Sequence, residues 1–145
     1  MVLNSTVMSF SQDTSHSSPL ISRAYDFAQS FAADGPEFLA SHLPDWFFVG
    51  TPSKTSVVQR DQFIEAAQGR AALVTGLGLA GPSLVNTTCE ELGDSYCLVT
   101  ANWQMTLPDA TTADLVEDFL IDRSGTEWVC LAYLLRQDLP GMLAN

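Results

Sequence analysis

The sequence is poor in basic residues. It contains 6 Lys and Arg against 17 Asp and Glu, which gives a formal net charge of −11 at pH 7. No two basic residues are adjacent, so no basic stripe forms that would attract a phosphate backbone or an anionic lipid surface. We therefore expect no nucleic-acid partner and no membrane partner, and we attribute the acidic excess to solubility.

Metal ligands, disulfide-forming cysteines and long apolar runs are also scarce. The three cysteines, Cys89, Cys97 and Cys130, lie in apolar strand-like segments, which favours reduced core thiols and hence a cytoplasmic location. Two histidines and these scattered cysteines form no ligand set, so we expect no metal and no other cofactor. No apolar run has transmembrane length. Residues 1–18 lack the basic start of a secretory signal, because the first basic residue is Arg23.

The rest of the composition is that of one globular domain. A chain of 145 residues with 46% hydrophobic content can bury a sizeable core. Residues 1–17 are rich in Ser, Thr, Asn and Gln and cannot bury enough apolar surface to offset the entropy of ordering. We therefore predict a flexible leader over residues 1–17 and a single domain over residues 18–145.

Helical spacing and helix-capping residues predict three helices. Ser18-Pro19 is a favourable helix start, and Asp34-Gly35 ends the first helix. A short second helix runs from Pro36 to Pro44, and a third follows Arg60-Asp61 and fades near Gly69. Glycines make residues 71–81 a loop or a frayed helix. The apolar positions of the first helix are Leu20, Ala24, Phe27, Ala28 and Phe31.

Alternation and turn residues predict the strands. A buried strand at residues 46–49 and an extended segment at 55–59 precede the third helix. Four further strands, joined by short turns, form an antiparallel meander. The order of elements predicts an α+β domain in which helices cover one face of a mixed or antiparallel sheet. The four strands are predicted at residues 83–91, 95–107, 113–122 and 127–135.

Two of these strands indicate which face is buried. In the strand 95–107, Val99, Ala101, Trp103 and Met105 should face the helices, because polar residues alternate with them. The last strand is apolar on both faces, which predicts a homodimer that forms through the outer sheet face. Regular alternation puts its inner face at Trp128, Cys130, Ala132 and Leu134.

Glu117 is the strongest candidate for a functional residue. Alternation puts it on one strand face with Leu115, Phe119 and Ile121, and puts Asp118 on the other. A carboxylate among apolar side chains is either satisfied by a hydroxyl or a tryptophan N–H, or held at the wall of a pocket. In a pocket, burial would raise its pKa and suit it to general acid or base chemistry.

Residues 18–136 resemble the nuclear-transport-factor-2-like superfamily, which includes ketosteroid isomerase, scytalone dehydratase, limonene epoxide hydrolase and polyketide-cyclase-like proteins. The resemblance is carried by the order of elements and by three short runs. It implies a curved sheet whose concave face and helices enclose a conical, largely apolar cavity, and frequent dimerisation. The runs are Asp34-Gly35-Pro36-Glu37, Leu43-Pro44-Asp45-Trp46-Phe47-Phe48-Val49 and Cys130-Leu131-Ala132-Tyr133.

The resemblance to ketosteroid isomerase does not extend to its catalytic groups. Aligned without gaps from Ala32 to Pro52, the general-base position of that enzyme falls at Thr51 and its oxyanion-hole tyrosine at Phe27. The position of its protonated aspartate falls at Glu117. One match in three argues against the same isomerase activity.

Further candidates surround Glu117. His42 is interpreted either as a proton-transfer partner of Glu117 or Asp45, or as a cap at the end of the second helix. Seven aromatic residues are expected either to line a ligand pocket or to pack as core. They are Phe27, Phe31, Phe48, Phe63, Trp103, Phe119 and Trp128.

Two functional hypotheses follow. In the first, the protein binds a small apolar molecule, and any catalysis would be a cofactor-free isomerisation, dehydration or cyclisation. In the second, it is a non-catalytic dimerisation or protein-interaction module. A Glu117 carboxylate bonded within the protein favours the module, whereas a carboxylate facing an open cavity favours ligand binding.

Overall fold

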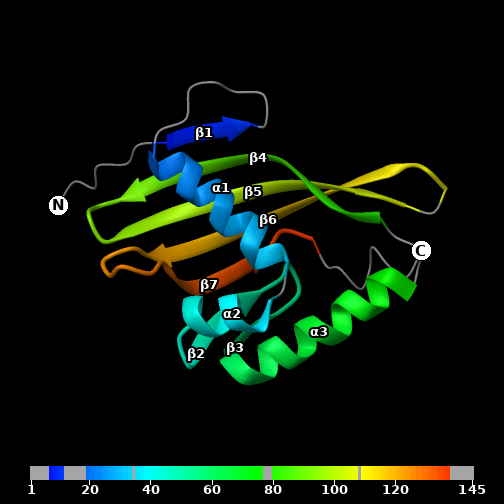
Figure 1. Ribbon diagram of the computed structural model, residues 1–145, viewed down its shortest axis with the longest axis horizontal. Helices are drawn as coiled ribbons and strands as arrows, with labels where there is room; N and C mark the ends of the chain where they lie inside the picture. The colour runs from blue at the N-terminus through cyan, green and yellow to red at the C-terminus, as the bar shows by residue number, and fades with distance from the viewer. Residues whose placement is uncertain (1–6, 12–18, 34, 77–79, 108, 138–145) are drawn as a thin grey trace.

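The computed structural model describes residues 7–11, 19–33, 35–76, 80–107 and 109–137. Within these ranges it has three helices and a curved, seven-stranded mixed sheet (Figure 1). The fold is α+β, as the order of sequence elements predicts.

The three helices cover one face of the sheet. Helix α1 is Pro19–Ala32, α2 is Pro36–His42 and α3 is Arg60–Gly76. Helix α3 is longer than its glycines suggested: an isolated glycine such as Gly69 costs only about 1 kcal/mol in a helix interior, and no proline interrupts the segment. None of the helices in the described ranges is long and apolar enough to cross a membrane.

The sheet has the strand order β1-β4-β5-β6-β7-β2-β3. Strands β4 to β7 form the predicted antiparallel meander, and β2 pairs with β7 in parallel. Strand β1 lies within residues 1–17, the predicted leader, and pairs with β4; the domain boundary at residue 18 stays a prediction. The strands are β1 Val7–Ser11, β2 Trp46–Gly50, β3 Thr55–Gln59, β4 Ala80–Leu92, β5 Tyr96–Thr106, β6 Thr112–Asp122 and β7 Val129–Leu135.

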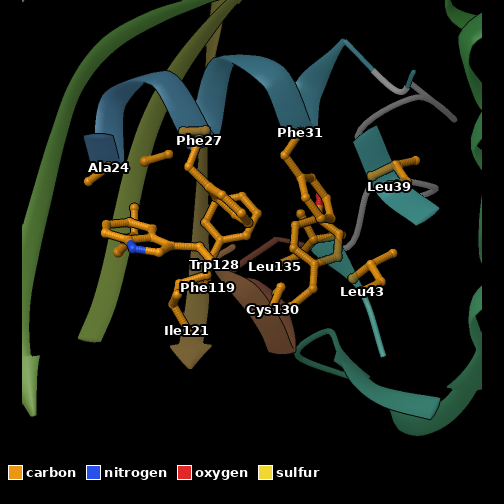
Figure 2. Close-up of a cluster of buried hydrophobic side chains, with 14 of the residues drawn as sticks. Ala24, Phe27, Phe31, Leu39, Leu43, Phe119, Ile121, Trp128, Cys130 and Leu135 are labelled. Carbon is orange, nitrogen blue, oxygen red and sulfur yellow. The ribbon is translucent and has the colours of Figure 1, made fainter. Parts of the chain in front are cut away.

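The inner face of the sheet packs against α1 and carries the core. The predicted inward residues of β5, from Val99 to Met105, are buried, and so are Phe119 and Ile121 on β6. Figure 2 shows Phe27 and Phe31 of α1 pointing toward this face. The predicted direction of the β5 side chains is therefore confirmed.

The run of apolar residues at 46–49 predicts a buried strand, but strand β2 is buried on one face only. Phe47 points inward and is buried, but Trp46 and Phe48 are 62% and 53% exposed. Side chains of a strand alternate between faces, and no helix in the described ranges covers the outer face of β2. The prediction of a buried strand holds for Phe47 and is wrong for its two neighbours.

Strand β7 contains one extra residue. Leu120 of β6 pairs with Ala132, yet the next β6 residue, Ile121, pairs with Cys130, so Leu131 has no partner. Such a bulge reverses the alternation that follows it. The prediction that Ala132 and Leu134 face inward is therefore wrong. The inward side chains are Trp128, Cys130, Tyr133 and Leu135, all buried.

We expect the core to tolerate a truncation at Phe119 poorly. The Phe119 ring is fully buried, with its centroid 4.9 Å from that of Phe31 and 5.4 Å from that of Tyr133. Phe119→Ala should lower the free energy of unfolding by about 3–5 kcal/mol in urea denaturation. Leu120→Ala is the matched control on the half-buried outer face and should cost much less. Equal costs for the two variants would contradict the assignment of faces.

Candidate functional site

The candidate site is built around Glu117 and Tyr133 on the inner face of the sheet. The Tyr133 hydroxyl donates a hydrogen bond to Oε2 of Glu117, and both side chains are buried. The two residues lie on adjacent strands, and Tyr133 faces inward because of the bulge at Leu131. Sequence reasoning identified Glu117 but missed Tyr133, because strict alternation in β7 placed the tyrosine on the outer face.

Three aromatic rings fix the position of the Tyr133 phenol. Its ring centroid is 5.4 Å from that of Phe119, 5.0 Å from Phe31 and 6.0 Å from Phe63. The Phe119 ring stacks on the phenol, the Phe31 ring is tilted against it and the Phe63 ring meets it edge-to-face, as is typical of protein cores. The apolar surroundings make the hydrogen bond between phenol and carboxylate stronger than it would be in water.

Two other polar side chains lie on the inner face, on strands β4 and β5. Thr87, Ala101 and Glu117 are in register across β4, β5 and β6, and Trp103 follows Ala101 by two residues on the same face. Oγ1 of Thr87 and Nε1 of Trp103 are buried and have no hydrogen-bond partner among the described residues. Thr87 was missed by sequence reasoning because a single threonine in a predicted strand gives no signal of burial.

Asp118, the residue after Glu117, is paired with a basic side chain. Asp118 points to the outer face, where it accepts hydrogen bonds from Thr100 at 2.6 Å and from Nε of Arg136 at 2.9 Å. The Asp118 carboxylate in turn raises the pKa of the Arg136 guanidinium. Asp118 is therefore held by an ion pair, whereas Glu117 is held by a phenol.

Cys130 lies beside this site as a buried thiol. Burial raises the pKa of its thiol well above the ordinary value, and the charge of Glu117 acts in the same direction. The thiol donates to the backbone oxygen of Ala132 at 3.3 Å. A neutral, buried thiol is a poor nucleophile.

His42 is not joined to Glu117 or Asp45. Its Nδ1 donates to the backbone oxygen of Phe38 at 2.8 Å, and its Nε2 lies 3.0 Å from Oε2 of Glu127. The imidazole also stacks on the Phe38 ring at 4.0 Å. Because both ring nitrogens are engaged at the end of α2, the geometry matches the predicted capping role and leaves no nitrogen for proton transfer with Glu117. Asp45 pairs with Arg60 instead.

The predicted ligand-lining aromatic residues divide into two groups. Phe48 is exposed on the outer face and cannot line an inner pocket, which corrects that prediction. The others are buried in the interior; Trp128, for example, packs against Phe27 and lies under the Arg23 guanidinium. A role in ligand contact stays a prediction for the buried group, which comprises Phe27, Phe31, Phe63, Trp103, Phe119 and Trp128.

The described residues contain no group of three or more His, Cys, Asp or Glu side chains arranged to hold a metal ion. The site thus consists of a carboxylate and a phenol within aromatic surroundings. Groups of this kind bind by hydrogen bonds and can transfer protons.

No protein-family model matches the chain, and no curated protein matches it. Solved structures do. A nuclear-transport-factor-2-like (NTF2-like) protein from Cytophaga hutchinsonii aligns with a TM-score of 0.58 at 13% identity, over 82% of this chain and 96% of that one. The chain has the NTF2-like fold.

Two further structures agree with this assignment. A protein of unknown function with a cystatin-like fold from Nostoc punctiforme has a TM-score of 0.54 at 12% identity, covering 82% of this chain and 88% of its own. A putative calcium/calmodulin-dependent protein kinase II association domain from Xanthomonas campestris has a TM-score of 0.54 at 12% identity, covering 85% and 89%. At these identities the similarity establishes the NTF2-like fold alone.

We expect Tyr133→Phe to destabilise the protein, because it removes one hydrogen bond to a buried carboxylate. Leaving a buried hydrogen-bonding group without its partner costs about 1–3 kcal/mol, and urea denaturation should show a loss of that size. Tyr96→Phe is the matched control, since Tyr96 is 44% exposed. A Tyr133→Phe variant as stable as Tyr96→Phe would contradict the Glu117–Tyr133 contact.

Proposed function

We propose that the protein binds a small, largely apolar molecule on the inner face of its sheet, with the Glu117–Tyr133 pair as the polar anchor. The observation that carries this proposal is the buried Glu117–Tyr133 pair among aromatic rings, on a sheet face that also holds two unpartnered polar atoms, Thr87 Oγ1 and Trp103 Nε1. The ring-bearing side chains around them would supply the apolar contacts.

The state of Glu117 alone would favour the module hypothesis, because Tyr133 already donates to it. Two further groups shift the balance. About nine in ten buried polar groups in proteins have a hydrogen-bond partner, and leaving one unpaired costs about 1–3 kcal/mol. Two such unpaired atoms on the same sheet face, Thr87 Oγ1 and Trp103 Nε1, support the ligand-binding hypothesis over the module.

If the bound molecule reacts, the Glu117–Tyr133 pair is the proposed acid–base group. A buried carboxylate and a phenol can exchange a proton with a substrate without any cofactor, which suits isomerisation, dehydration or cyclisation. Thr51, at the general-base position of ketosteroid isomerase, lies in the β2–β3 turn and bonds to the Lys54 backbone. The chemistry of that enzyme is therefore not part of the proposal.

The test uses the neutral fluorescent probe N-phenyl-1-naphthylamine, whose rings suit an aromatic site and whose N–H can donate to Glu117. The wild-type protein should bind it with enhanced fluorescence. Glu117→Gln should weaken binding at least about tenfold, because a hydrogen bond to a charged acceptor is worth about 1.5–3 kcal/mol.

Glu65→Gln, which changes an exposed carboxylate of α3, is the control and should bind like the wild type. Far-ultraviolet circular dichroism of both variants would show whether the fold is kept. Absence of binding to the wild type, or equal binding by Glu117→Gln, would refute the proposed function.

The outer face supports a second proposal, a homodimer through this face. Apolar side chains of five neighbouring strands are in register there, and the face also carries Trp46 and Leu134. Exposed apolar surface of this extent marks interaction sites. The Xanthomonas structure with this fold is described as an association domain. The residues in register are Val57, Phe48, Ala132, Leu120 and Leu98.

The wild-type protein should sediment as a dimer at micromolar concentration, and Phe48→Glu should sediment as a monomer. The glutamate would bury an unpaired charge in the dimer, which costs far more than the lost apolar contact. Val85→Glu changes an exposed valine of β4 outside the row and should leave the dimer intact. A monomeric wild type, or a dimeric Phe48→Glu, would exclude this interface.

We also propose a cytoplasmic location from the cysteines. Cys89, Cys97 and Cys130 are buried and free of disulfides. Reduced buried thiols suit a reducing compartment, where they act as small apolar core residues.

A further inference from the structure

We propose that protonated His42 is a pH-dependent clamp that ties helix α2 to the β6–β7 loop, residues 123–128. This inference is independent of the proposed ligand site and rests on the contacts of the imidazole. The loop matters to the interior because it ends at Trp128, a buried side chain that packs against the Phe27 ring (Figure 2).

Both ring nitrogens of His42 face an oxygen that accepts hydrogen bonds. Nδ1 lies 2.8 Å from the backbone oxygen of Phe38, and Nε2 lies 3.0 Å from Oε2 of Glu127. A neutral imidazole carries a single N–H, so in that form one contact would set a nitrogen lone pair against an oxygen lone pair. Only the imidazolium donates from both nitrogens. The geometry therefore selects the charged form of the ring.

The surroundings of the ring also favour a positive charge. His42 is the last residue of α2, and cations are stabilised at helix C-termini. The imidazole stacks on the Phe38 ring at 4.0 Å and lies 5.9 Å from the Phe27 ring centroid. Aromatic faces attract cations at these distances. Two features besides Glu127 thus stabilise the imidazolium.

Glu127 is the charged group that contacts the imidazole among the described residues. The other charged side chains on the elements around His42 are bonded elsewhere or exposed. Arg60 pairs with Asp45 and Asp61, and Arg123 donates to the backbone oxygen of Gly93. The exposed carboxylates are Asp26 on α1, Glu37 on α2 and Glu65 on α3.

Arg23 of α1 ties the same loop in a way that does not depend on pH. Its guanidinium donates to the backbone oxygen of Thr126 at 2.8 Å and lies 4.8 Å from the Trp128 ring centroid. An arginine stays protonated in proteins, whereas histidine loses its proton in the physiological pH range. As the pH rises, His42 therefore loses one of its two hydrogen bonds while Arg23 keeps its own. The clamp is closed at low pH and loosens toward alkaline pH.

Trypsin cleavage after Arg123 measures opening of the loop. Arg123 is the first loop residue, and its guanidinium donates to the backbone oxygens of Gly93 and Tyr96 when the loop is closed. Cleavage of the full chain is followed by mass spectrometry, relative to cleavage after the exposed Lys54, so that the pH dependence of trypsin cancels.

His42→Gln keeps a side-chain donor but removes the charge. At pH 6.0 it should be cleaved after Arg123 about two- to fivefold faster than the wild type, the effect of one partly exposed ion pair. Glu127→Gln should match it. At pH 8.5 most of the difference from the wild type should disappear. Arg23→Gln is the matched control and should speed cleavage by the same factor at both pH values, because it removes the tie that does not titrate.

NMR of the ring nitrogens links the cleavage to the proton. The His42 signals, assigned from their loss in His42→Gln, should show two protonated nitrogens at pH 6.0 and one at pH 8.5. The cleavage ratio between His42→Gln and the wild type should follow the same titration. A neutral ring at pH 6.0, a His42→Gln effect of equal size at both pH values, or no effect at either would overturn the clamp.

Discussion

The interior of this protein depends on one extra residue in β7. Leu131 has no partner on β6, and the bulge it forms turns Tyr133 inward, where it donates to Glu117. Without the bulge, the same strand would present Ala132 and Leu134 to the core and leave Glu117 without this phenol. Bulges commonly redirect a side chain in this way next to functional sites. The candidate site is therefore a consequence of strand register.

Strand β6 buries one carboxylate on each of its two faces, and the two are paired with different partners. Asp118 meets Arg136 and Thr100 on the outer face, where a charged partner can stay half in water. Glu117 faces an interior in which no basic side chain is buried among the described residues, and a phenol takes the place of a cation. The two carboxylates of β6 are thus paired by different chemistry, an ion pair on one face and a neutral donor on the other.

The structure also moves side chains between the two faces of the sheet. Regular alternation predicts Leu134 inside and Tyr133 outside, and Phe48 is expected at a pocket; in the structure Phe48 and Leu134 lie on the outer face and Tyr133 lies inside. The inner surface is aromatic, with a few polar atoms, and the outer surface has an apolar row across five strands. The proposed ligand site and the proposed dimer interface do not exclude each other, because the residues assigned to them lie on opposite faces of one sheet.

The sequence by itself determined the fold class, the helices α1 and α2, the meander β4 to β7 and the burial of Glu117. Local spacing, capping residues and alternation encode these features, since each depends on residues close in the chain. Only the tertiary structure decided the partner of Glu117, the engagement of His42 by Glu127 and the direction of Phe48. Each of these depends on pairing between distant strands and loops, and a single-residue shift in register reverses every side chain that follows.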